Sequence, residues 1–215
     1  MSTNASARRV VIAGGSGFLG QSLARHLDHF GFEVVILSRH EPTASGPWRF
    51  EVWDARNMGA WASSLDGAAA VVNLVGRSVD CIKTPDHCDE ILRSRVDATR
   101  VLGQAVAAAH NRPRVWVQMS TAHIYGDPPE AVCDESSSFG YGLAPEVGRA
   151  WEKAFAESIP DGVRGVVLRT SFVIGRGGGC SFEALDARPV WARRHSGKRA
   201  AGYELDSQSG HEPDL

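Results

Sequence analysis

The fold is decided by a stretch near the amino terminus, which reads Val10-Val11-Ile12-Ala13-Gly14-Gly15-Ser16-Gly17-Phe18-Leu19-Gly20. Its first four residues are apolar and mostly β-branched, as in a buried parallel strand. Glycines then recur at every third position, and apolar residues continue at helical spacing as far as Leu27. A strand, a glycine-rich turn and an amphipathic helix in this order predict a βα unit that binds a dinucleotide.

Each glycine of the turn has a physical role in such a unit. Gly14 can adopt the positive φ of a tight turn, Gly17 lets the backbone approach a diphosphate, and Gly20 permits close packing of helix on strand. The N–H groups and dipole at the start of the helix favour phosphate. We therefore predict that the pyrophosphate of a nicotinamide cofactor contacts Gly14, Gly15, Ser16, Gly17, Phe18, Leu19 and Gly20. The alternative is a glycine-rich turn without a ligand; a Walker-type phosphate loop is excluded, because no Gly-Lys-Ser or Gly-Lys-Thr follows.

The end of the second predicted strand distinguishes the two nicotinamide cofactors. An acidic residue at this position binds the ribose 2′-hydroxyl of NAD, whereas an arginine accommodates the 2′-phosphate of NADP. The sequence here is Ser38-Arg39. A guanidinium matches phosphate geometry, so we expect NADP rather than NAD, with Ser38 and Arg39 among the contacts. A solvated loop arginine is the alternative.

The pattern continues outward from this unit. Short apolar segments alternate with helix-length amphipathic segments over residues 8–179. The predicted strands are Val10–Ala13, Val34–Ser38, Phe50–Trp53, Val71–Val75, Val115–Met119 and Val166–Arg169. Beyond the first helix, the predicted helices span about Asp89–His110 and Glu146–Ser158. This alternation predicts an α/β fold with a doubly wound parallel sheet, the Rossmann architecture.

Composition narrows the class of protein further. The chain has 215 residues, 43% of them hydrophobic, and a formal net charge of -2, which suits one globular domain. Near-neutral charge predicts no nucleic-acid partner, and without a long apolar run or a signal segment we expect no membrane association and a cytoplasmic protein. The four cysteines form no CxxC pair, so neither a disulfide framework nor a metal site is expected.

Several segments resemble the extended short-chain dehydrogenase/reductase superfamily. The match covers about residues 8–179 and is carried by the glycine fingerprint, Trp53-Asp54, Asn73-Leu74-Val75-Gly76, the segment from Ser120 to Gly126, and Leu168-Arg169-Thr170. Ser94-Arg95-Val96-x-x-Thr99 and Trp151-Glu152 are similar to an atypical epimerase-family subgroup whose members are often labelled nucleoside-diphosphate-sugar epimerases. The resemblance implies a dinucleotide and a small or sugar-like molecule as partners. It also implies that two helices could pair across a two-fold axis in a homodimer.

The resemblance also implies roles for particular residues. Asp54 would contact the adenine, and Leu74, Val75 and Gly76 would line the cofactor. Thr121 falls where family members keep a hydroxyl that hydrogen-bonds the reacting oxygen; a threonine that caps a turn is the alternative. His123 could serve as a proton shuttle, although a structural histidine is the commoner case.

The acid–base pair of the superfamily, a Tyr with a Lys four residues later, is absent. Counting back from Glu152 places Ala144 at the tyrosine position and Gly148 at the lysine position. The nearest phenol, Tyr141, has Pro145 four residues later. Three hypotheses therefore stay open: an atypical NADP(H)-binding reductase acting by hydride transfer, a noncatalytic dinucleotide-binding regulatory or interaction protein, and a non-functional truncated product.

The carboxyl-terminal segment differs in character from the rest. We predict a flexible amino terminus over 1–7, a NAD(P)-binding Rossmann domain over 8–179 and an irregular tail over 180–215. The resemblance stops after Gly179, so we expect the substrate lobe to be largely absent. Back-translation of the tail, shifted by one nucleotide, can give a Ser-Trp-Ile-His string similar to the family's continuation, which predicts that the tail is out of frame.

Overall fold

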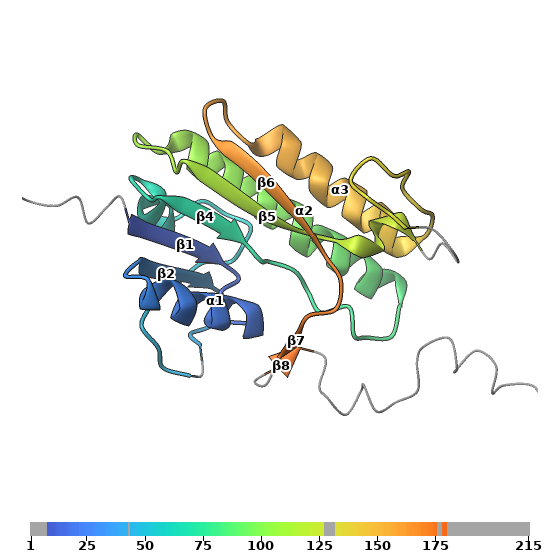
Figure 1. The fold of residues 1–215 in the computed structure, drawn as a ribbon, viewed down its shortest axis with the longest axis horizontal. Coiled ribbons are helices and arrows are strands. Elements are labelled where there is room, and N and C mark those ends of the chain that lie inside the picture. The colour runs from blue at the N-terminus through green and yellow to red at the C-terminus, as the bar shows by residue number, and fades with distance from the viewer. Residues whose placement is uncertain (1–7, 43, 127–131, 176–177, 180–215) are drawn as a thin grey trace, which may run out of the picture.

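The fold is built on a six-stranded parallel sheet with strand order β3-β2-β1-β4-β5-β6 (Figure 1). The structure is a computed structural model that describes residues 8–42, 44–126, 132–175 and 178–179. The predicted segments 1–7 and 180–215 lie outside the described residues. Within the sheet, every pair of neighbouring strands is parallel, and the chain order reverses between β1 and β4. This is the doubly wound Rossmann topology that the sequence predicts.

The strands lie close to their predicted places. They are β1 (Arg9–Ala13), β2 (Glu33–Ser38), β3 (Arg49–Val52), β4 (Ala70–Asn73), β5 (Val115–Thr121) and β6 (Arg164–Thr170). The prediction extended β4 to Val75, but the Oδ1 of Asn73 accepts the N–H of Val75 at 3.1 Å and the strand ends there. Leu74 and Val75 therefore lie in the loop that follows β4. A small antiparallel pair, β7 (Ile174–Gly175) and β8 (Gly178–Gly179), forms a separate sheet.

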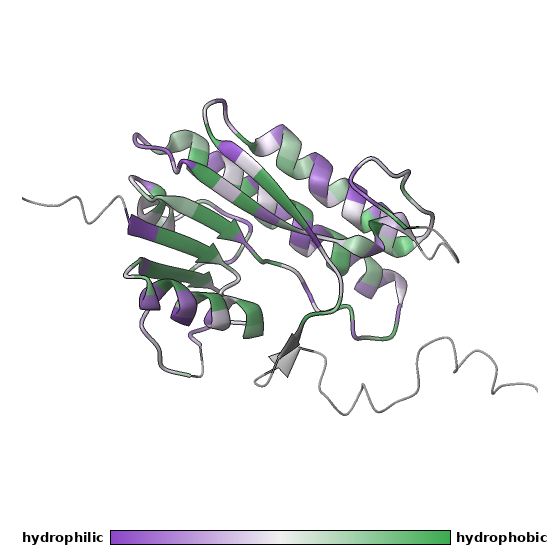
Figure 2. Ribbon diagram, viewed as in Figure 1, coloured by the Kyte–Doolittle hydropathy of each residue, from purple (hydrophilic) through white to green (hydrophobic). Residues whose placement is uncertain are grey.

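Helices cover both faces of the sheet (Figure 1). One face packs on α1 (Phe18–His29), whose Ala24 is fully buried against Ile12 and Ile36. The opposite face packs on α2 (Pro85–Ala108), α3 (Leu143–Ser158) and the short helix η2 (Ala60–Leu65). Another short helix, η3 (Ala122–Tyr125), follows β5 directly. Figure 2 shows the central strands as the most hydrophobic part of the chain, in keeping with burial on both faces.

A buried polar network joins α2 and α3 to the centre of the sheet. The Nδ2 of Asn73 donates to Thr99 Oγ1 at 3.1 Å and to Gln118 Oε1 at 3.0 Å, and the indole N–H of Trp151 also donates to Thr99 Oγ1 at 3.1 Å. Thr99 in turn donates to the carbonyl of Arg95 at 2.8 Å. Asn73, Thr99 and Gln118 have no solvent exposure. The network therefore fixes the carboxyl end of β4. These three side chains are fully buried, so water cannot take the place of these hydrogen bonds.

Candidate dinucleotide site

The glycine loop follows β1 and turns directly into α1. Gly14 has φ +74°, and its N–H donates to the Leu37 carbonyl at 2.8 Å, which confirms the tight turn expected there. A Cβ on Gly17 would meet only the Gly14 carbonyl oxygen at 3.9 Å, so this position faces open space. Gly17 is the N-cap of α1, and no side chain of the described residues caps it. The free N–H groups at this helix start suit a phosphate.

Gly20 has a different role from the one predicted. We expected it to bring the helix close to the strand, but a Cβ here would lie 2.3 Å from the Cα of Gly15, within the loop itself. Gly15 instead makes the contact with the sheet, since its Cβ would lie 2.9 Å from a side-chain carbon of Ile36. The first turn of α1 therefore packs on the loop through Gly20, and the loop packs on the sheet through Gly15.

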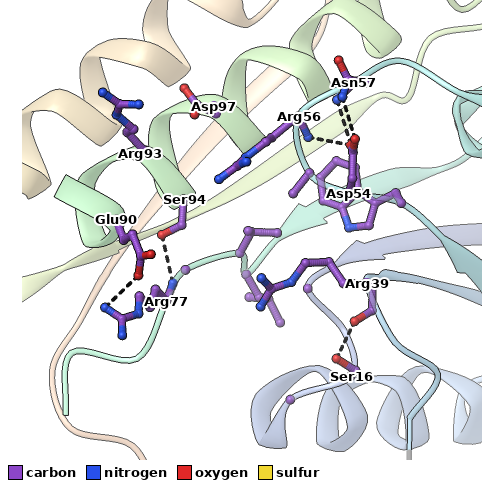
Figure 3. A pocket seen from close by; sticks show the side chains of 18 of the residues that line it. Ser16, Arg39, Asp54, Arg56, Asn57, Arg77, Glu90, Arg93, Ser94 and Asp97 are labelled. Carbon is purple, nitrogen blue, oxygen red and sulfur yellow. Dashed lines mark hydrogen bonds and ion pairs between the residues drawn. The ribbon is translucent and has the colours of Figure 1, made fainter. Parts of the chain in front are cut away.

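The end of β2 is tied to the glycine loop. The hydroxyl oxygens of Ser16 and Ser38 lie 2.6 Å apart, and Gln21 Nε2 donates to the Ser16 carbonyl at 2.6 Å. Arg39 follows Ser38 and is exposed. Its guanidinium points into the cleft beside the loop (Figure 3).

The end of β3 forms a tight turn around Asp54. Its Oδ1 accepts the N–H groups of Arg56 at 2.9 Å and Asn57 at 2.8 Å, and its Oδ2 accepts the Asn57 side chain at 2.6 Å. The hydrogen bond from the Asn57 side chain and those from the two backbone N–H groups lower the pKa of Asp54 to about 2. Asp54 is therefore ionised at neutral pH and shapes the turn that follows it.

The loop after β4 forms the wall opposite Asp54. A Cβ on Gly76 would lie 2.9 Å from the Cζ of Arg95, so a side chain at position 76 would displace this guanidinium. Arg95 donates to the carbonyls of Arg77 at 3.2 Å and Ile91 at 2.9 Å, and it stacks on the Trp151 ring at 5.1 Å. Burial lowers its pKa to about 10, which leaves it charged at neutral pH.

These strand ends enclose one cleft of about 810 Å³ at the carboxyl edge of the sheet (Figure 3), a size in the usual range of ligand sites. Of the predicted cofactor contacts, the cleft is lined by Gly14, Ser16, Gly17, Ser38, Arg39, Asp54, Leu74, Val75 and Gly76. Gly15, Phe18, Leu19 and Gly20 do not line it. The sequence interpretation missed further lining residues, among them Arg56, Asn57, Arg77, Glu90, Arg93, Ser94 and Asp97.

The two predicted catalytic residues lie at the end of β5, outside this lining. The Oγ1 of Thr121 accepts the N–H of His123 at 3.1 Å, so Thr121 caps η3 and its hydroxyl hydrogen has no acceptor among the described residues. The exposed ring of His123 contacts Phe172 edge-on, with 5.4 Å between ring centroids. Both residues lie at the same carboxyl edge as the glycine loop, two strands away.

The absent lysine has a packing explanation. Gly148 is buried in α3, and a Cβ there would lie 3.0 Å from the fully buried Ile124 side chain of η3. Any larger residue at position 148 would have to displace Ile124. Tyr141, the phenol nearest in sequence, is 94% exposed. The helix α3 begins at Leu143, so Pro145 lies within its first turn and not at its start.

An ion pair anchors α3 to the sheet beside η3. Arg169 of β6 contacts both carboxylate oxygens of Glu152, at 2.9 and 2.8 Å, and Ser120 donates to Glu152 at 2.6 Å. Arg169 also donates to the phenol oxygen of Tyr125 at 2.7 Å. Burial alone would raise the pKa of Glu152, but the hydrogen bonds from Arg169 and Ser120 outweigh it and lower this pKa. The same pairing raises the pKa of Arg169.

No group of three or more metal-ligating side chains occurs among the described residues, and no helix in this part of the chain could span a membrane. The sheet order, the glycine loop and the strand ends around the cleft together define a Rossmann-type dinucleotide-binding protein.

Comparison with known proteins identifies the family. Residues 10–198 match the NAD dependent epimerase/dehydratase family, and the chain belongs to this NAD(P)-binding family. The match extends beyond Gly179. The human epimerase family protein SDR39U1 is 33% identical over 181 residues, which is 82% of this chain and 58% of the human protein.

Solved structures agree with this assignment. The crystal structure of human SDR39U1 (isoform 2) with NADPH superposes with a TM-score of 0.70 at 31% identity, over 82% of this chain and 58% of that one. A nucleoside-diphosphate sugar epimerase from Corynebacterium glutamicum gives a TM-score of 0.68 at 31% identity, over 86% of this chain and 38% of that one. The chain thus spans little more than half the length of the human relative.

Proposed function

We propose that this chain binds NADP(H) in the cleft beside the glycine loop and that the bound dinucleotide serves hydride transfer on a small or sugar-like substrate. The observation that supports this most directly is the uncapped start of α1 behind the open Gly17 position. Arg39, at the end of β2, supports NADP over NAD. The human relative solved with NADPH is consistent with this choice.

Residues at different positions along the carboxyl edge of the sheet would contact different parts of the cofactor and substrate. The glycine loop and α1 would hold the pyrophosphate, Arg39 the 2′-phosphate, and Asp54 with Leu74–Gly76 the adenosine side of the cleft. The nicotinamide, when bound, supplies hydride chemistry. Thr121 would donate its free hydroxyl hydrogen to the reacting oxygen, and His123 would exchange a proton with solvent through its exposed ring.

Isothermal titration of the 215-residue chain with NADPH and NADH tests this proposal. We expect NADPH to bind more tightly than NADH, and Gly17→Val to abolish binding of both because its side chain fills the phosphate approach. Arg39→Gln should weaken NADPH selectively. If neither dinucleotide binds the unaltered chain, the proposal is wrong.

A second candidate function is supported by the packing of Gly148 on Ile124. A chain that has no Tyr and Lys at positions 144 and 148 could use the dinucleotide to stabilise a contact with another protein, without turnover. The two functions differ in one measurement. Oxidation of bound NADPH in the presence of small carbonyl compounds supports the reductase, whereas tight binding without any oxidation supports the regulatory protein.

A further inference from the structure

The cleft contains two arginines whose charge nothing in the described chain neutralises. Four arginines line it: Arg39, Arg56, Arg77 and Arg93. Arg77 pairs with Glu90 at 3.0 Å, and Arg93 pairs with Asp89 at 2.9 Å. The guanidinium groups of Arg39 and Arg56 make no hydrogen bond or ion pair within residues 8–42, 44–126, 132–175 and 178–179. Two unpaired cations in one cleft indicate an anionic ligand group.

The topology brings these two arginines to neighbouring strand ends. Strands β2 and β3 are paired with Ser38 opposite Val52, and the N–H of Trp53 donates to the Ser38 carbonyl at 3.1 Å. Arg39 directly follows the first of these strands, and Arg56 follows the second within one turn. In Figure 3 both side chains extend into the cleft, Arg39 from the side of the glycine loop and Arg56 from the side of Asp54.

The turn that carries Arg56 is held in a conformation that directs it inward. Ala55 has φ +62°, and it is the only non-glycine residue of the described chain with positive φ. The left-handed conformation costs roughly 1 kcal/mol for such a residue. Asp54 offsets this cost by accepting the next two backbone N–H groups. A strained turn at the rim of a cleft is where a ligand-contacting side chain is expected.

The acidic residues of the cleft leave the charge of Arg56 available. Both carboxylate oxygens of Asp54 are occupied by Arg56 N–H and Asn57 donors, so Asp54 faces its own turn. Asp97 also lines the cleft, but it forms no ion pair with either arginine. A phosphate monoester carries about -1.5 to -2 charges at neutral pH and offers three acceptor oxygens, which matches two guanidinium groups.

We infer that Arg56 is a second specificity-determining residue, which binds the 2′-phosphate of NADP(H) together with Arg39. This inference rests on the proposed function, because it needs a dinucleotide in the cleft. The competing role for Arg56 is stacking on the adenine, which would serve NADH and NADPH alike. The two roles predict different effects on cofactor selectivity.

The test is isothermal titration of the 215-residue chain with NADPH and with NADH. The variants are Arg56→Gln, Arg39→Gln, the double variant, and Arg100→Gln as a control that removes an exposed arginine of α2 outside the cleft. We expect Arg56→Gln to weaken NADPH binding about tenfold, the effect of one charge-assisted hydrogen bond, and NADH binding less than twofold. Arg100→Gln should leave the ratio of the two affinities unchanged.

The double variant tests whether both arginines bind one phosphate. Two cations on the same group are coupled, so the loss in the double variant should differ from the product of the two single losses. Equal weakening of NADPH and NADH by Arg56→Gln would overturn the inference in favour of adenine stacking, and unchanged affinities for both cofactors would overturn it outright. Either result leaves dinucleotide binding by the unaltered chain standing, and it is the loss of that binding that would overturn the proposed function.

Discussion

Replacing Thr99 with valine tests the buried hydrogen-bond network that joins α2 and α3 to the end of β4. Valine has nearly the shape of threonine, but it lacks the oxygen that accepts from Asn73 and Trp151, each at 3.1 Å. Both donors are buried: Asn73 has no exposure and Trp151 is 4% exposed. The substitution therefore leaves two buried N–H groups without an acceptor, while the second hydrogen of the Asn73 amide keeps its bond to Gln118.

The magnitude follows from the cost of each orphaned donor. A buried polar group left unsatisfied costs roughly 1–3 kcal/mol, so the two together should lower the free energy of unfolding by about 3 kcal/mol. In a domain of this size 1 kcal/mol shifts the melting temperature by roughly 2–4 °C, which predicts a fall of about 6–12 °C. The effect should reach the cleft as well, because Asn73 also accepts the N–H of Val75.

Thermal and urea unfolding followed by circular dichroism measure the effect. Thr99→Ser is the matched control: it keeps the hydroxyl, removes one methyl group and should cost only about 1 kcal/mol. The reasoning would be refuted if Thr99→Val unfolded within about 1 kcal/mol of the unaltered chain, or if serine were as harmful as valine, because the methyl contact would then be the source of stability.

Two further predictions concern the ion pair of α3 and the glycine loop. The pKa of Glu152 is lowered by folding, so its carboxylate stabilises the fold above the unfolded pKa near 4.5, and this stability is lost as the pH falls through the lowered folded value. The melting temperature of the unaltered chain should therefore fall more steeply between pH 5 and pH 3, in a scan of roughly these limits, than that of Glu152→Gln; parallel pH profiles would contradict the pairing. Gly20→Ala should cost about 3 kcal/mol in urea unfolding and weaken dinucleotide binding, because its Cβ would lie 2.3 Å from the Cα of Gly15. Gly162→Ala is the control for the removal of a glycine, because a Cβ at this position meets nothing within 4 Å. Its φ of +85° adds a strain of roughly 1 kcal/mol. Equal losses of unfolding free energy at the two positions would show that overlap with Gly15 is not the cause.

The fold was largely predictable because its strands are continuous apolar segments and its helices have apolar residues at regular three- and four-residue spacing. All six predicted strands and all three predicted helices occur in the structure. The predicted ends of helices and strands were less accurate where a side-chain hydrogen bond, and not a change in the hydrophobic pattern, ends the element. The helix α2 begins four residues earlier than predicted because Thr84 caps it, accepting the N–H of His87 at 3.2 Å, and Pro85 takes its first position. Thr84-Pro85 was a readable signal in the sequence.

The parts of the candidate site that belong to local sequence motifs were predictable. The side chains that reach the cleft from other segments were less so. The glycine loop, Arg39 and the end of β4 belong to local motifs, and the structure brings them to one cleft. Arg56 belongs to no motif. Its position depends on the pairing of β3 with β2 and on the left-handed Ala55, neither of which the sequence displays. Its only signal was its place two residues after the expected adenine contact.

The packing of α3 limits how this chain could carry out proton transfer. In the superfamily that the sequence resembles, the cation beside the catalytic phenol stands on this helix. Here Gly148 lies against Ile124, and Ile124 belongs to η3, the same short helix that Thr121 caps and that contains His123. The close approach of α3 therefore leaves no room for the usual lysine, and at the same time it fixes the short helix that contains His123 and that Thr121 caps. If the chain reduces a substrate by hydride transfer, the Thr121 hydroxyl is the group that we propose to hydrogen-bond the reacting oxygen. Thr121→Val should therefore strongly lower the rate of NADPH oxidation while dinucleotide binding is retained, and an unchanged rate would contradict this role.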